Sequence, residues 1–146
     1  SLMQWNAIQK RVLKKLTIDL SLNESTKMDN KIDVLKFTNE WIRSWNSNDL
    51  DDILNHYSDD VEITSPMTRL AAGINTETLN GKGFVAEDWK KALKINPDLR
   101  FDLIDAAEGI NSVALYCKSV MNKKTVEAMF FDQDGKVSKI FAHYTK

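Results

Sequence analysis

Residues 41–66 read WIRSWNSNDLDDILNHYSDDVEITSP. The pattern of this stretch predicts the end of one helix, a turn, a second helix and a strand. Apolar residues recur at helical spacing over 30–46, which predicts a core helix with a wide apolar stripe. Residues 46–49 form a turn that also offers an N-cap, and a short second helix is predicted over 50–57. The alternation of apolar and polar residues over 61–64 then predicts a strand that ends at the proline.

The rest of the chain changes from helix to strand. Residues 66–80 have no clear period and are long for a connection inside a compact domain, so we interpret them as a candidate mobile lid. A third helix is expected over 84–95, because Asn96-Pro97 disfavours its continuation. Four strands joined by short turns follow, at 99–106, 112–121, 124–132 and 136–144. Short links indicate an antiparallel meander, and helices followed by strands indicate an α+β fold with the helices on one face of a bent sheet.

The composition is typical of a single soluble globular domain. The chain has 146 residues, of which 42% are hydrophobic and 28% are charged. No apolar run approaches the roughly 20 residues that a membrane-spanning helix needs. The formal net charge of −1 gives no basic face for a nucleic-acid backbone. Because Cys117 is the sole cysteine, no intramolecular disulfide can form, which fits a reducing compartment. We therefore expect a cytoplasmic protein with no nucleic-acid or membrane partner.

Residues 1–27 differ in charge from the rest of the chain, since they hold five basic and two acidic residues. We interpret them as an N-terminal extension, either a peripheral helix or sequence upstream of a natural start at Met28. Ser1 and Leu2 are typical of residues left by an expression vector. Residues 28–146 are predicted to form the single domain.

Three strings resemble a known family. The first is the stretch 41–66 quoted above. The second is NGKGFVAEDW at 80–89, which leads into NPDLRFDLIDAAEGINSVAL at 96–115, and the third is FFDQDGKVSKIFAHY at 130–144. Together they make residues 30–144 resemble the SnoaL-like/ketosteroid-isomerase-like branch of the nuclear-transport-factor-2-like superfamily. The resemblance implies a cone in which a curved antiparallel sheet wraps around three helices and encloses a pocket.

Most of the ketosteroid-isomerase site is replaced when the resemblance carries it onto this chain. The tyrosine donor of that family aligns with Trp41 and its aspartate base aligns with Ser65, so the usual isomerisation route is disfavoured. The carboxylic acid that the family keeps neutral, so that it can donate a hydrogen bond, aligns with Glu127. The alignment also turns Glu127 and Tyr144 toward the pocket, in agreement with strand alternation.

SnoaL-like polyketide cyclases work with a single acid–base carboxyl and no cofactor. The leading hypothesis from the resemblance is therefore a cofactor-independent isomerase or cyclase on a small apolar carbonyl compound, with Glu127 as acid and Tyr57 or Tyr144 orienting it. Substrate-binding positions are predicted at Trp41, Ser65, Met67, Trp89 and Met129. No histidine and carboxylate have metal-ligand spacing, and Gly81-x-Gly83 lacks the rest of a nucleotide loop, so neither a metal nor a nucleotide cofactor is expected.

Some of these residues also have a structural interpretation. Trp41, Trp45 and Trp89 are of a type that often anchors a core, and Glu127 could serve as the partner of a buried tyrosine hydroxyl. The rival function is a non-catalytic ligand-binding or dimerisation module. By analogy with the family, we expect a homodimer formed through the convex outer face of the sheet, which carries Val126, Ala128, Phe130, Phe141 and His143.

Overall fold

The computed structural model describes residues 32–68, 77–119 and 122–146 of the chain. The predicted extension at 1–27 and residues 69–76 of the predicted lid lie outside the described residues. The elements follow in the order α2 (Val34–Ser47), α3 (Leu50–Leu54), β1 (Tyr57–Thr64), β2 (Thr78–Asn80), α5 (Lys82–Ile95), β3 (Asp102–Gly109), β4 (Ser112–Lys118), β5 (Lys124–Phe131) and β6 (Val137–Tyr144). None of the described helices is long and apolar enough to cross a membrane.

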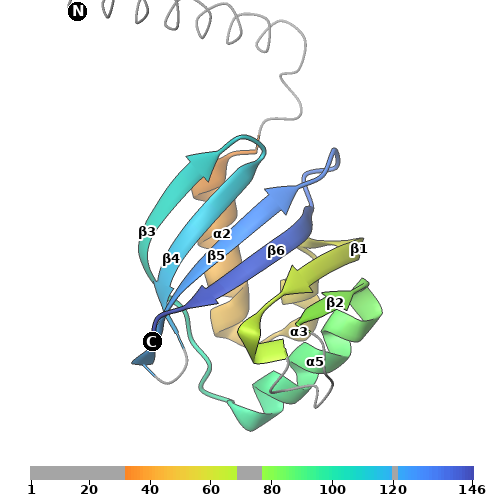
Figure 1. Cartoon of the computed structure of the whole chain (residues 1–146), viewed down its shortest axis with the longest axis vertical. Helices are drawn as coiled ribbons and strands as arrows, with labels where there is room; N and C mark the ends of the chain where they lie inside the picture. The colour runs from red at the N-terminus through yellow and green to blue at the C-terminus, as the bar shows by residue number, and fades with distance from the viewer. Residues whose placement is uncertain (1–31, 69–76, 120–121) are drawn as a thin grey trace, which may run out of the picture. The chain divides into compact units, whose positions relative to one another are not determined.

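Helix α2 carries the apolar stripe that its sequence predicts. Asp33 caps its N-terminus by accepting a hydrogen bond from the Lys36 amide at 3.1 Å. Asn48 ends the helix in the left-handed conformation, with φ at 57°, and its amide donates to the Trp45 carbonyl. The buried positions recur three and four residues apart, as Phe37, Thr38, Trp41, Ser44 and Trp45. In Figure 1 this helix lies behind the strands, across one face of the sheet.

The second helix is shorter than predicted, and the placement of Tyr57 in it is wrong. Helix α3 ends at Leu54, and Tyr57 is the first residue of β1. The apolar spacing of the sequence fits one more helical turn, but the backbone at this point pairs with β6. The Val137 amide donates to the His56 carbonyl at 2.8 Å, and Tyr57 lies opposite Val137. Strand pairing made by a distant segment therefore overrides the local helical period.

The six strands form one curved, open sheet in the order β2-β1-β6-β5-β4-β3 (Figure 1). The predicted antiparallel meander is confirmed over β3 to β6. Strand β1 joins it by pairing with β6 in parallel, which requires the long intervening chain that contains α5. The α+β fold, with helices on one face of a bent sheet, is thus confirmed.

Strand β2 was not predicted. It lies at the end of the segment interpreted as a lid, where Leu79 pairs with Ile63 of β1. Its three residues are too few to produce a recognisable alternation, so its strand conformation depends on the neighbouring β1. The lid interpretation is wrong for these residues.

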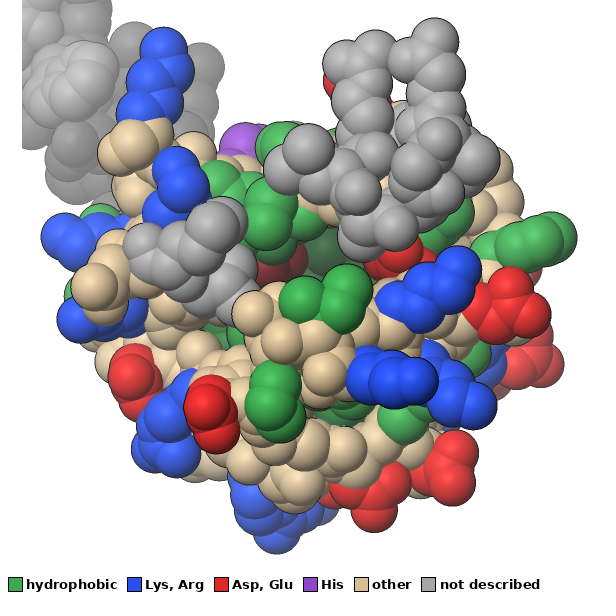
Figure 2. Space-filling view, turned by 90° about the horizontal axis from the view of Figure 1, so that it is seen from below, with side chains coloured by type: hydrophobic (Ala, Val, Ile, Leu, Met, Phe, Trp, Pro, Cys, Tyr) green, Lys and Arg blue, Asp and Glu red, His purple; other side chains and the backbone are tan. Residues whose placement is uncertain are grey.

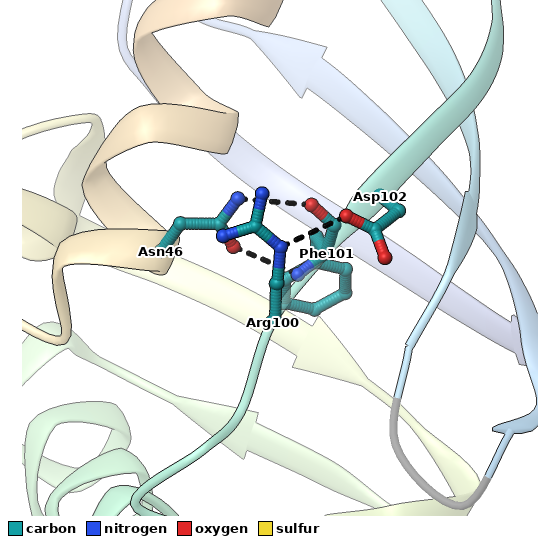
Figure 3. Close-up of polar contacts among 4 residues, drawn as sticks. All are labelled: Asn46, Arg100, Phe101 and Asp102. Carbon is teal, nitrogen blue, oxygen red and sulfur yellow. Dashed lines mark hydrogen bonds and ion pairs between the residues drawn. The ribbon is translucent and has the colours of Figure 1, made fainter.

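The start of β3 is set by the end of α2. The predicted strand begins at residue 99, whereas β3 begins at Asp102. The Asn46 side chain forms two hydrogen bonds with the Phe101 backbone. Its oxygen accepts from the Phe101 N–H at 2.8 Å, and its nitrogen donates to the Phe101 carbonyl at 3.0 Å (Figure 3). Arg100 pairs with Asp102 at 3.0 Å beside this contact. The side-chain amide of Asn46 thus satisfies the backbone groups of Phe101 that a neighbouring strand would otherwise bond. The Phe101 side chain is in the core, and 6% of the residue is exposed.

The two faces of the sheet differ as predicted over β5 and β6, whereas every residue of β3 is exposed. On β5, Thr125, Glu127 and Met129 are buried, whereas Phe130 is exposed. Residues opposite each other on neighbouring strands share a face of the sheet. The register therefore builds the inner face from three rows, which are Val113–Met129–Ile140, Leu115–Glu127–Ala142 and Cys117–Thr125–Tyr144.

Candidate active site

Glu127 lies in the middle of the inner face, between Leu115 on β4 and Ala142 on β6. The residue is 7% exposed, and its carboxyl makes no hydrogen bond or ion pair with any residue that the structure describes. Burial disfavours the charged form and raises the pKa of Glu127 from 4.5 to about 7. Near neutral pH this carboxyl is therefore divided between acid and carboxylate, which suits a group that exchanges protons.

Three weaker acids surround this carboxyl. Burial, and then the charge of Glu127, raises the pKa of both Cys117 and Tyr144 to about 12. Burial also raises the pKa of Tyr57, to which the charge of Glu127 adds, while two indole hydrogen bonds act in the opposite direction. Because all three groups stay protonated at neutral pH, Glu127 is the member of this cluster that titrates there.

Tyr57 is held by tryptophans. It is 1% exposed, and its hydroxyl oxygen accepts hydrogen bonds from Trp41 Nε1 at 2.7 Å and from Trp45 Nε1 at 3.3 Å. The Trp89 ring packs on the Tyr57 ring with 4.9 Å between centroids. Phe101 completes the aromatic cluster, 4.9 Å from Trp41 and 5.5 Å from Trp45. These offset and edge contacts fix the ring of Tyr57 in one position.

Tyr144 has a different partner, at the end of β1. The Ser65 side chain lies close enough to Tyr144 to lower the pKa of that tyrosine, against the larger effect of burial. The Ser65 hydroxyl also accepts from the Met67 amide at 3.2 Å, so its own proton is available for Tyr144. Ser65 is 6% exposed and Met67 is half-buried.

The end of the molecule at which β6 terminates is hollowed. Figure 2 shows this end, with hydrophobic and acidic side-chain atoms visible below the rim of the hollow. Ala142 lies opposite Glu127 on the inner face and is half-buried. Among the described residues, no group of three or more His, Cys, Asp or Glu side chains could hold a metal ion.

The comparison with known families agrees with this architecture. The family described as SnoaL-like domain matches residues 38–137, which is more than half of the chain. The chain belongs to the SnoaL-like domain family.

The solved structures of SnoaL-like proteins include one close in sequence. A SnoaL-like protein of unknown function from Burkholderia thailandensis is 39% identical, with a TM-score of 0.74 over 77% of this chain and 94% of that chain. A candidate isomerase of the SnoaL-like family from Agrobacterium tumefaciens is 11% identical, with a TM-score of 0.61 over 77% and 97% of the two chains.

A candidate polyketide cyclase from Sinorhizobium meliloti is also 11% identical, with a TM-score of 0.61 over 74% of this chain and 94% of that chain. At this identity the likeness to the Agrobacterium and Sinorhizobium proteins shows the fold alone. No curated protein matches the sequence.

Within this SnoaL-like domain, the predicted acid and the two predicted tyrosines lie close enough to interact electrostatically. Ser65 joins them through Tyr144. Trp41 and Trp89 lie in the aromatic cluster around Tyr57. Met129 is fully buried in the apolar row next to that of Glu127, so its predicted contact with a ligand stays a prediction, as does that of Met67.

The structure adds three groups to the predicted residues of this SnoaL-like site. Trp45 is buried in the core, as expected of a core anchor, and its indole also donates to Tyr57, because the spacing of four from Trp41 places both indoles on one helix face. Cys117 and Thr125 lie opposite each other in the row beside Glu127. The Thr125 hydroxyl is buried without a partner among the described residues. Strand alternation places Thr125 on the side of Glu127, as predicted, and the same alternation on β4 places Cys117 on the inner face with Leu115.

Proposed function

We propose that this SnoaL-like domain catalyses proton transfer next to the carbonyl group of a small, mostly apolar compound, with Glu127 as the acid. The observation that carries the proposal is the buried carboxyl of Glu127, which has no partner among the described residues and a pKa raised to about 7. A carboxyl in this state can donate a proton to a carbonyl oxygen and take it back near neutral pH.

The step is an enolisation. Glu127 donates its proton to the carbonyl oxygen as the neighbouring C–H bond breaks. The electron pair of that bond forms the C=C bond of the enol, and the released proton goes to water. The apolar row next to that of Glu127 favours a mostly hydrocarbon compound, whereas Tyr57 and Tyr144 provide hydroxyl groups within electrostatic range of the carboxyl. The isomerase and cyclase descriptions of the Agrobacterium and Sinorhizobium proteins are compatible with such a step.

The test is deuterium exchange of a simple aryl ketone in heavy water. α-Tetralone, followed by proton NMR, should lose its α-proton signal faster with the wild-type protein than with Glu127→Gln, which keeps the shape of the side chain but cannot supply the acid. Glu87→Gln, which changes an exposed carboxylate on α5, is the matched control and should exchange like the wild type. Equal exchange rates for the wild type and Glu127→Gln would rule out Glu127 as the acid.

A dimerisation role is favoured by a separate observation on the outer face of the sheet. Phe130 is 41% exposed and Phe141 is 38% exposed, and their rings meet edge to face with 6.3 Å between centroids. Val126 and Ala128 are half-buried on the same face. An apolar surface of this kind gains free energy when it is covered, so we propose that two copies of the chain associate through it.

A further inference from the structure

The hydroxyl oxygen of Tyr57 accepts two hydrogen bonds from indole N–H groups, which cannot act as acceptors. Trp41 Nε1 lies 2.7 Å from the Tyr57 oxygen, and Trp45 Nε1 lies 3.3 Å from it. An indole N–H can only donate, whereas a phenol has two acceptor lone pairs and one proton. Both lone pairs are therefore engaged, and the Tyr57 proton is the single hydrogen-bonding function that remains.

That proton has no acceptor among the residues that the structure describes. Tyr57 is 1% exposed, so bulk water reaches little of it. A buried donor left without an acceptor costs free energy that a ligand can recover. The charge of Glu127 acts on Tyr57, which places the hydroxyl within electrostatic range of the proposed acid. The Tyr57 proton is therefore a donor that an oxygen of a bound ligand can engage.

We propose that Trp41 and Trp45 are positioning residues that make Tyr57 a fixed donor to a ligand oxygen. The inference rests on the proposed function and names a second group that meets the ligand oxygen. The ligand atom beside Tyr57 must be an acceptor, such as a carbonyl oxygen, because the tyrosine oxygen cannot accept from a ligand N–H or O–H group. Hydrogen bonds in a chain polarise one another, so each indole also strengthens the donation by Tyr57.

Neighbouring contacts keep the two indoles in place. Phe101 packs on both rings, and Asn46 holds the Phe101 backbone through two hydrogen bonds. Trp89 provides a contrast, because its ring packs on Tyr57 at 4.9 Å while no hydrogen bond joins its indole to the hydroxyl. Donation to Tyr57 is thus a property of Trp41 and Trp45 rather than of the cluster as a whole.

The test measures the infrared stretching frequency of the α-tetralone carbonyl in complex with the full-length protein. A hydrogen bond to the carbonyl lowers this frequency. The frequency should be lowest in the wild type and should rise in the order Trp45→Phe, Trp41→Phe and Tyr57→Phe, because the Trp41 bond is the shorter of the two. A benzothiophene isostere of tryptophan at position 41, with sulfur in place of the N–H, keeps the packing and should reproduce the frequency of Trp41→Phe.

The possible results separate this inference from the proposed function. A wild-type frequency with the isostere, or a frequency that does not change in Tyr57→Phe, overturns the inference even if Glu127→Gln stops deuterium exchange. A frequency that follows Tyr57 and Trp41 while Glu127→Gln exchanges normally supports the inference and contradicts the proposed function. Failure of the wild type to bind α-tetralone contradicts both. Failure of Trp41→Phe to fold leaves the isostere as the deciding variant.

Discussion

The burial of Glu127 predicts that this residue destabilises the folded chain above neutral pH. In the unfolded chain the carboxyl titrates near its ordinary pKa of 4.5, whereas in the folded chain it titrates at about 7. Below pH 4.5 both states hold the proton and burial imposes no ionisation penalty. Between pH 4.5 and 7 the unfolded chain loses its proton first, so the free energy of unfolding falls as the pH rises.

The size of the effect follows from the two pKa values. Their difference corresponds to about 3 kcal/mol of unfolding free energy, fully developed above pH 7. Glu127→Gln removes the titration. Relative to the wild type, this variant should therefore gain up to about 3 kcal/mol between pH 4.5 and 8. Any fixed cost of burying the amide is the same at every pH, so the change of the difference with pH is the decisive quantity.

The assay is urea denaturation of the wild type and Glu127→Gln at a series of pH values, followed by tryptophan fluorescence. Glu87→Gln is the matched control, because it changes one exposed carboxyl and should parallel the wild type at every pH. A constant difference between Glu127→Gln and the wild type from pH 4.5 to 8 would refute the reasoning, since it would mean that Glu127 titrates at the same pH in both states.

Two further predictions concern the frame of the site and the outer face. Asn46→Ala should lower the free energy of unfolding by about 2 kcal/mol, because it removes both hydrogen bonds to the Phe101 backbone. In urea denaturation the control Asn48→Gly, which keeps the left-handed backbone accessible and loses one exposed hydrogen bond to the Pro97 carbonyl, should cost less, and equal costs would contradict this account. Phe141→Lys should convert a dimer into a monomer in light scattering, whereas Ile110→Lys, at a position 92% exposed in the β3–β4 turn, should not. A wild-type chain that is monomeric at high concentration would contradict the proposed interface.

The parts of the fold that could be predicted from the sequence are those encoded by local periodicity. The stripe of α2 and the alternation of β5 need only spacings of three to four and of two residues, and the structure has both. Tyr57 and β2 could not be predicted in this way. Tyr57 continues a helical spacing but pairs with β6, and β2 exists through its pairing with β1. In both places a partner distant in sequence decides the conformation.

The same distinction applies to the candidate site. Glu127 could be assigned to the inner face because alternation and the family resemblance agree on its side of the strand. The lack of a partner for its carboxyl among the described residues could not be predicted, because it depends on which side chains three other elements bring to it. Trp45 is a similar case. Its indole looks like a core anchor in the sequence, and only the position of Tyr57 at the start of β1 gives that N–H its acceptor.

Asn46 and Glu127 are both polar residues, but only Asn46 has partners for its polar atoms among the described residues, and this difference indicates why Glu127 is a carboxyl. Asn46 is half-buried, whereas Glu127 is 7% exposed and lies on the inner face of the sheet. Asn46 uses its oxygen and its nitrogen on a single backbone residue, which is how a buried amide stabilises a fold. Glu127 lies between Leu115 and Ala142, where an apolar side chain would pack without an ionisation penalty. The Glu127 carboxyl lowers the free energy of unfolding by about 3 kcal/mol above pH 7. The tyrosine proton left without an acceptor also destabilises the fold. Both groups become useful when a ligand oxygen engages them.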